Sequence, residues 1–179
     1  MTTDSDAEFT ALVLRQARFV FQVAYAVLLN AHEAEDAVQE TFLKLYRNRG
    51  WQRAKNERAF LARTAWRVAL DLRPRGPRSL AMLDPLDCAD AIPAPEPGPE
   101  QILLSADQHA RVHSALNTLP EDLRLPLLLS SFEELNSREI GSVLGIPEGT
   151  VRTRLQRARS LLREKLARLQ VRAEEVRHG

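Results

Sequence analysis

Several residue classes that would indicate other kinds of protein are scarce in this chain of 179 residues. Cys88 is the single cysteine, which excludes an internal disulfide and leaves no cysteine cluster for a metal. The longest apolar run, residues 19–29, is interrupted by Gln22 and is too short to cross a bilayer. The N-terminal residues are acidic where a secretion signal would be basic. We therefore expect a cytoplasmic protein without a metal or another cofactor.

Strand patterns, phosphate-binding loops and an excess of one charge are also missing. The chain has no alternating apolar pattern, few clusters of Val, Ile or Tyr, and no Gly-rich loop that opens a helix. Its net charge is only +1, so any nucleic-acid binding must depend on local positive charge. The composition therefore predicts an all-α protein.

Residues 74–100, PRGPRSLAMLDPLDCADAIPAPEPGPE, are rich in proline and acidic side chains and keep no helical period. Such a segment cannot bury enough apolar surface to offset its ordering entropy, so we interpret it as a flexible linker. It divides one helical unit, residues 6–73, from a second, residues 101–172. The predicted architecture is two small helical domains joined by this Pro-rich acidic linker.

The second unit contains a helix-turn-helix pattern in LNSREIGSVLGIPEGTVRTRLQRAR (135–159). Asn136 with Glu139 three residues later is a capping box, which starts a helix. Gly145 and Pro147 end that helix, and a second one follows within a few residues. Gly141 costs this first helix about 1 kcal/mol relative to Ala. We interpret it as the place where the second helix crosses closely.

The second helix of this motif has one apolar stripe and one polar face. The stripe is formed by Val151, Leu155, Ala158 and Leu162, at helical spacing. Polar residues occupy the opposite face and the flanks of the stripe: Arg152, Thr153, Arg154, Gln156, Arg157 and Arg159. Arginine donors on a helix suit phosphates and base edges in a major groove. The alternative is an ordinary solvated charged surface.

Three helices are expected in the first unit, over about 9–29 (one helix or two), 33–47 and 57–73. In the middle one, Ala37, Phe42, Leu45 and Tyr46 are predicted to face the core. Its exposed surface is acidic and carries Glu33, Glu35, Asp36, Gln39 and Glu40. The helix macrodipole explains the first three adequately, but the last two lie past the first turn.

Aromatic and basic residues alternate around the third expected helix. They are Trp51, Arg53 and Lys55 in a loop, then Arg63, Trp66 and Arg67 in the helix. Single-stranded DNA binds such sets, because bases stack on rings while cations follow the backbone. A core tryptophan beside an ordinary basic surface is the alternative.

Three segments together resemble regions 2 and 4 of bacterial sigma-70-type factors of the extracytoplasmic-function (ECF) group. They are AHEAEDAVQETFLKLY (31–46), FLARTAWRVALDLR (60–73) and ALNTLPEDLRLPLLLSSFEELNSREIGSVLGIPEGTVRTRLQRARSLLREKL (115–166). Their order and the linker length match as well. The resemblance is specific, because it combines PxGTVxxRLxRAR with an upstream LPxxxR and an AEDAxQExF segment.

The resemblance implies a promoter-specificity factor that binds core RNA polymerase and melts the minus 10 element. The acidic helix would dock on the clamp helices of the largest subunit through Glu35, Asp36, Gln39 and Glu40, and the second unit would contact the flap region. Minus 10 binding would fall to Trp51, Arg53, Lys55, Arg63, Trp66 and Arg67. In the minus 35 element Arg152, Thr153, Gln156 and Arg157 would read bases, while Arg154 and Arg159 would contact phosphates. The linker would thread polymerase channels, and an anti-sigma protein would be the regulator.

Three positions depart from the family pattern. Arg67 stands where the family usually has Asn, Pro126 lies inside an expected helix, and Glu134 replaces a usual turn glycine. In a helix interior a proline costs about 3 kcal/mol unless the helix kinks.

Two other functions compete with this interpretation. A stand-alone dimeric regulator would explain the helix-turn-helix but not the acidic helix. A metal protein or enzyme has its best support in His109 and His113, four residues apart, but no Glu follows His109 and no third ligand is near in sequence. No set of nucleophile, base and orienting group occurs, so we predict no catalytic activity.

Overall fold

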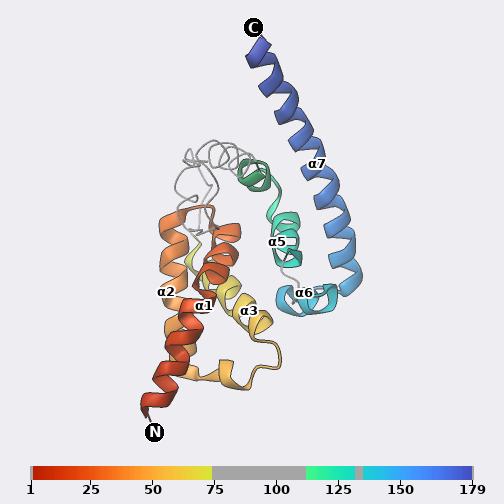
Figure 1. Cartoon of the computed structure of the whole chain (residues 1–179). Coiled ribbons are helices and arrows are strands. Elements are labelled where there is room, and N and C mark those ends of the chain that lie inside the picture. The colour runs from red at the N-terminus through yellow and green to blue at the C-terminus, as the bar shows by residue number, and fades with distance from the viewer. Residues whose placement is uncertain (1, 74–111, 132–134, 179) are drawn as a thin grey trace.

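The computed structural model describes residues 2–73, 112–131 and 135–178, with side chains for 5–73, 112–131 and 135–168. The N-terminal unit consists of α1 (Thr2–Leu28), α2 (Ala31–Asn48), the 3-10 turn η1 (Gly50–Arg53) and α3 (Glu57–Leu72). The C-terminal unit contains α5 (Glu121–Ser130), α6 (Ser137–Leu144) and α7 (Glu148–His178), preceded by a helical stretch at 112–117. Figure 1 shows α7 extending past the other labelled helices. No strand occurs in the described ranges, and the predicted all-α class is confirmed. The predicted linker, Cys88, His109 and Glu134 lie outside them.

Asparagine caps explain where α2 and α3 begin. Asn30 Oδ1 accepts the N–H of Glu33 at 3.2 Å, and Asn56 Oδ1 accepts that of Ala59 at 2.9 Å. At the other end of α2, Arg49 adopts a left-handed conformation and donates its N–H to the Leu45 carbonyl. Both helices match the predicted 33–47 and 57–73 closely. The segment 9–29 is part of a single helix, α1.

The core of the N-terminal unit is built on α1. Val20, Val23 and Val27 are fully buried, as are Leu61 of α3 and Ala37 of α2. The segment Ser5–Leu28 is long and apolar enough to pass for a membrane span, and half of its most apolar window is buried inside the fold. A core helix passes the same test of length and composition.

Tyr46 departs from the predicted core of α2. Ala37, Phe42 and Leu45 are buried as expected, but Tyr46 is 46% exposed. Its ring packs edge-on against Phe9, with centroids 5.1 Å apart. The residue lies at the margin of the buried stripe, where an aromatic side chain can cover the core while its hydroxyl stays near solvent.

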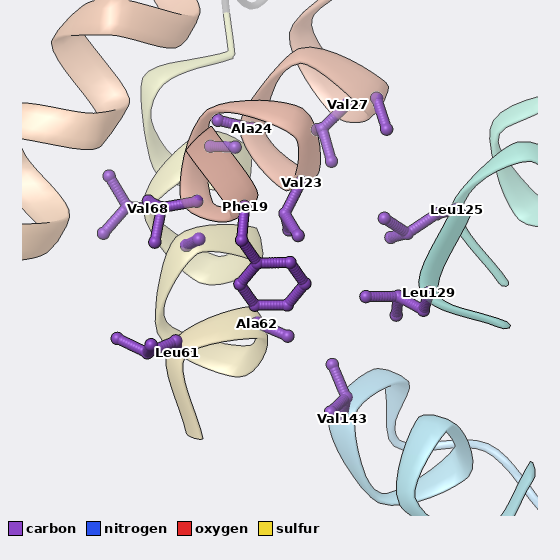
Figure 2. Close-up of a cluster of buried hydrophobic side chains, with 14 of the residues drawn as sticks. Phe19, Val23, Ala24, Val27, Leu61, Ala62, Val68, Leu125, Leu129 and Val143 are labelled. Carbon is purple, nitrogen blue, oxygen red and sulfur yellow. The ribbon is translucent and has the colours of Figure 1, made fainter. Parts of the chain in front are cut away.

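The two units share one hydrophobic core. Leu125 and Leu129 of α5 point toward Val23 and Phe19 of α1, and Val143 of α6 approaches the same cluster (Figure 2). The contact is extensive enough that the C-terminal unit packs against α1 and α3 directly. The sequence pattern gave no sign of this junction, because each unit has an apolar periodicity of its own.

Pro126 is accommodated at this junction. It lies inside α5, which continues to Ser130, and its ring is buried. Burial of the apolar Pro126 ring therefore offsets part of the cost of the backbone hydrogen bond that proline removes from α5.

Candidate nucleic-acid interface

The helix-turn-helix begins at the predicted capping box, which is confirmed. Asn136 Oδ1 accepts the N–H groups of Arg138 and Glu139, both at 3.0 Å. Glu139 Oε2 in turn accepts the Asn136 N–H at 2.8 Å. Gly145 ends α6 in the left-handed region, with φ of 67°. Both ends of α6 are therefore fixed by the residue types that the sequence places there.

Gly141 allows the two helices of the motif to approach closely, as predicted. A Cβ at this position would lie 2.7 Å from the Ile146 carbonyl oxygen and 3.6 Å from Val151 Cγ2. The first contact is with backbone, which cannot rotate away as a side chain does. Gly141 therefore sets the crossing of α6 and α7.

One face of α7 is buried and the other is open to solvent. Val151 and Ala158 are fully buried and Leu155 is 6% exposed, so the predicted apolar stripe is confirmed at these positions. Five of the predicted DNA-contacting residues lie on the open face and are exposed: Arg152, Thr153, Gln156, Arg157 and Arg159.

Arg154 is separated from this group. Its side chain is 32% exposed and its Nε lies 3.9 Å from Oδ2 of Asp122 in α5. It lines a hollow at the junction together with Trp66 and Pro126. The structure thus turns this arginine toward the fold and away from the exposed face of α7.

Glu148, in the first turn of α7, was not singled out by the sequence analysis. Its carboxylate pairs with Arg152 of the same helix, and its Oε2 lies 3.7 Å from Arg138 Nε of α6. The hydrogen bond from Arg152 lowers the pKa of Glu148 below its usual value, and the charges of Arg152 and Arg138 act in the same direction. Glu148 is ionised at neutral pH, as a glutamate with an ordinary pKa also is. The spacing of Glu148 and Arg152, four residues apart, was the available signal.

The acidic face of α2 is present and open. Glu35, Asp36 and Gln39 are exposed. Glu40 is partly exposed and has Lys44 Nζ at 3.9 Å from its Oε1. Lys44 Nζ also lies 3.8 Å from Asp71 Oδ2 of α3, so part of this surface is already paired with a cation.

The predicted aromatic and basic set divides into two groups in the structure. Trp51 is half-buried in η1 and packs on Phe9, with ring centroids 6.0 Å apart, while Arg53 and Lys55 nearby are exposed. The packing of Trp51 agrees with the core alternative for that residue.

The other group lies on α3 and faces the C-terminal unit, except for Arg67, which is exposed. Arg63 Nη2 donates to the backbone carbonyl of Ser142 and, at 2.7 Å, to its hydroxyl oxygen. Trp66 is half-buried in the hollow that contains Arg154. Asn56 Nδ2 donates to Glu139 Oε1 at 2.8 Å, so Glu139 of the α6 capping box also binds the N-terminal unit.

A buried arginine completes the junction. Arg124 of α5 is only 6% exposed. Its Nε donates to the Ala26 carbonyl at 2.7 Å, and its Nη1 donates to the carbonyls of Leu119 and Asn117 at 2.9 and 3.1 Å. Ala26 lies in the last turn of α1, where carbonyls have no partner within the helix and where a cation is favoured by the macrodipole. Arg124 thus caps a helix of the other unit.

Comparisons with known proteins agree with both halves of this description. A model described as Sigma-70 region 2 matches residues 12–76, and one described as Sigma-70, region 4 matches residues 109–162. The chain is 36% identical to the ECF RNA polymerase sigma factor SigE of Mycolicibacterium smegmatis over 88% of its length, and spans 61% of that relative. It is 32% identical to the ECF sigma factor SigW of Bacillus subtilis, covering 82% of each chain.

Solved structures show the same fold. The sigma factor RpoE of Bartonella quintana, in complex with the anti-sigma factor NepR, aligns with a TM-score of 0.60 at 21% identity, over 89% of this chain and 97% of that one. CnrH, in complex with the cytosolic domain of CnrY, aligns with a TM-score of 0.59 at 21% identity, over 90% and 89% of the two chains.

Proposed function

This chain belongs to the sigma-70 family of RNA polymerase sigma factors, in its ECF group, and we propose that it directs core RNA polymerase to promoters in the cytoplasm. The observation that carries the proposal is the exposed polar face of α7 on a capped helix-turn-helix, in the same chain as an open acidic face on α2. The first surface suits DNA and the second suits a basic protein.

The acidic face of α2 would bind the clamp helices of the largest polymerase subunit. Glu35, Asp36 and Gln39 are exposed and Glu40 is partly so. Complementary charge steers association and suppresses wrong partners, because like charges placed opposite each other cost several kcal/mol. The C-terminal unit would contact the flap region.

The exposed face of α7 would read the minus 35 element. A major groove about 12 Å wide admits a helix, and side chains near its N-terminal end contact base edges. Arg152, Thr153, Gln156 and Arg157 would face bases, with Arg159 on a phosphate. Arg154 would need to leave Asp122 before it could contact DNA.

Minus 10 binding would use α3 and η1. Arg53, Lys55 and Arg67 are open to solvent, whereas Arg63 contacts Ser142 and Trp66 faces the C-terminal unit. The two promoter elements are about 25 base pairs apart, roughly 85 Å at 3.4 Å per base pair. Because α6 touches α3 directly, the two units must separate before both elements can be bound.

An anti-sigma protein is the expected regulator. The two solved structures named above are complexes, and one of these is with a protein described as an anti-sigma factor. A partner that favours the packed arrangement of the two units would keep Arg63 and Trp66 from DNA.

Replacement of Asp36 and Glu40 by Lys tests the docking assignment. Binding to core polymerase, measured by competition, should weaken by several kcal/mol in free energy while circular dichroism stays unchanged. Asn48→Ala, at an exposed position at the other end of the same helix, is the control and should bind normally.

Transcription tests the function itself. Core polymerase with this chain should initiate from specific promoters, and core polymerase alone should not. Specific duplex binding by the isolated chain without any binding to core would instead indicate a stand-alone regulator, and would overturn the proposal.

A further inference from the structure

One carboxylate stands at the start of the basic face of α7. Glu148, Arg152, Gln156, Arg159 and Arg163 follow at steps of four, four, three and four, which places them along one side of a helix. A carboxylate at this place would repel DNA phosphates if it acted alone. We therefore asked what Glu148 contributes to this otherwise basic surface.

Glu148 is held between two arginines. It pairs with Arg152, which is 69% exposed, and its Oε2 lies 3.7 Å from the Nε of Arg138, which is 87% exposed. Glu148 itself is 33% exposed. The guanidinium of Arg152 thus has one part fixed by the carboxylate and the rest open to solvent.

We propose that Glu148 is a positioning residue for Arg152, and that the pair makes Arg152 a reader of guanine in the minus 35 element. The inference rests on the proposed function. Arginine has five N–H donors in a rigid fork, so a carboxylate can hold some of them while others span guanine O6 and N7. An arginine fixed in this way loses less rotamer freedom on binding than a free one.

The carboxylate also limits what else Arg152 can do. A free arginine at this position would bind any nearby phosphate and add affinity for all sequences. Pairing with Glu148 neutralises that cation and places a negative charge near the DNA backbone. Glu148 therefore lowers non-specific affinity and raises discrimination between bases. A glutamate is charged at neutral pH at its ordinary pKa, and Arg152 and Arg138 lower that pKa further, so the charge that this function requires is present.

The chain provides a matched control on the same helix. Glu164 accepts a hydrogen bond from Arg168 Nη2 at 2.6 Å, also four residues apart, with side chains 55% and 77% exposed. This pair has the same chemistry but lies four turns farther along α7. Glu164→Ala removes one negative charge without touching Arg152.

The experiment measures binding of holoenzyme to duplex DNA randomised across the minus 35 window, at two salt concentrations, for the wild type, Glu148→Ala, Arg152→Ala, the double variant and Glu164→Ala. For Glu148→Ala we expect about tenfold weaker discrimination at one base pair, the same pair at which Arg152→Ala acts. Affinity for unrelated DNA should rise, and the salt dependence should steepen by about one phosphate contact. In the Arg152→Ala background the same change should leave discrimination unaltered.

Three results would overturn the assignment. Full discrimination in Glu148→Ala would show that Arg152 needs no support. A further loss of discrimination in the Arg152→Ala background would mean that Glu148 contacts a base itself. If Glu164→Ala lost as much discrimination between bases as Glu148→Ala, the effect would come from the removal of a negative charge anywhere on α7. A wild-type holoenzyme without any base preference would instead overturn the proposed function, and this inference with it.

Discussion

The two candidate DNA-binding surfaces of this chain differ in how accessible they are. On α7, five of the six residues predicted to contact the minus 35 element are exposed. On α3, Arg63 is bound to Ser142 and Trp66 lies in a hollow at the junction between the two units. The first candidate surface is open to solvent, whereas part of the second is covered by the C-terminal unit.

This difference has a physical cause in the junction. Apolar side chains of α5 and α6 complete the core around Phe19 and Val23 of α1, and Arg124 caps the end of α1 from the other unit. Burial of apolar area stabilises the packed arrangement, but the hydrophobic effect is not directional. The hydrogen bond from Arg124 to the Ala26 carbonyl is directional, so it fixes how the two units are oriented. Within residues 148–168 of α7, whose side chains are described, the residues opposite the apolar stripe are exposed to solvent.

The largest expected effect comes from Arg124→Ala. It removes three hydrogen bonds to backbone carbonyls in a buried place, and unsatisfied buried groups are costly. We expect a loss of about 3 kcal/mol in the free energy of unfolding, measured by urea denaturation. Arg157→Ala, on the exposed face, is the control. A loss below about 1 kcal/mol for Arg124→Ala would show that the junction does not depend on this residue.

A smaller loss is expected from Gly141→Ala, which tests the rigidity of the exposed DNA-binding unit. The new methyl group would meet the Ile146 carbonyl at 2.7 Å, so α6 and α7 must move apart. Overpacking of this kind costs about 1–3 kcal/mol, reduced by the better helix propensity of Ala. At Gly149 an added Cβ would meet nothing within 4 Å. Gly149→Ala should therefore leave stability equal or slightly higher in the same denaturation assay.

The helix-turn-helix was largely predictable from the sequence, and the junction between the two units was not. The capping box at Asn136, the glycine at the crossing and the buried stripe from Val151 to Ala158 all follow from local spacing. Local spacing reports which face of a helix is apolar, but it does not report which other element covers that face. The ion pair of Arg154 with Asp122 and the hydrogen bond of Arg63 to Ser142 join residues far apart in sequence.

Two arginines of α7 can be compared directly: Arg157, which is exposed, and Arg154, which pairs with Asp122 of α5. Arg157→Ala should cost about 1–3 kcal/mol in DNA binding and relax preference at one base pair. Arg154→Ala should weaken all sequences alike and lower the salt slope by about one, if this side chain leaves Asp122 for a phosphate. Holoenzyme binding to minus 35 variants at two salt concentrations separates the two outcomes. An unchanged salt slope for Arg154→Ala would mean that the Arg154 side chain keeps its ion pair with Asp122 of α5 when DNA is bound.

The smallest expected effect comes from Ser142→Ala. It removes the hydroxyl that accepts from Arg63 at 2.7 Å but keeps the backbone carbonyl contact. Stability should fall by less than about 1 kcal/mol, and the free chain should bind a single-stranded minus 10 oligonucleotide slightly more tightly. Arg63→Ala should weaken that binding instead. The same direction of change in both variants would contradict the view that this contact competes with DNA.

The proposed separation of the two units is tested most directly by measuring the distance between them in the free chain and in the promoter-bound holoenzyme. Leu72→Cys on α3 and Ser160→Cys on α7, both at exposed positions, would carry a pair of spin labels in a chain whose natural thiol is removed by Cys88→Ser. We expect a single, well-defined distance in the free chain, and an increase of several tens of Å when the holoenzyme binds a promoter, since the elements lie roughly 85 Å apart at 3.4 Å per base pair. An equal distance in both states would contradict the account.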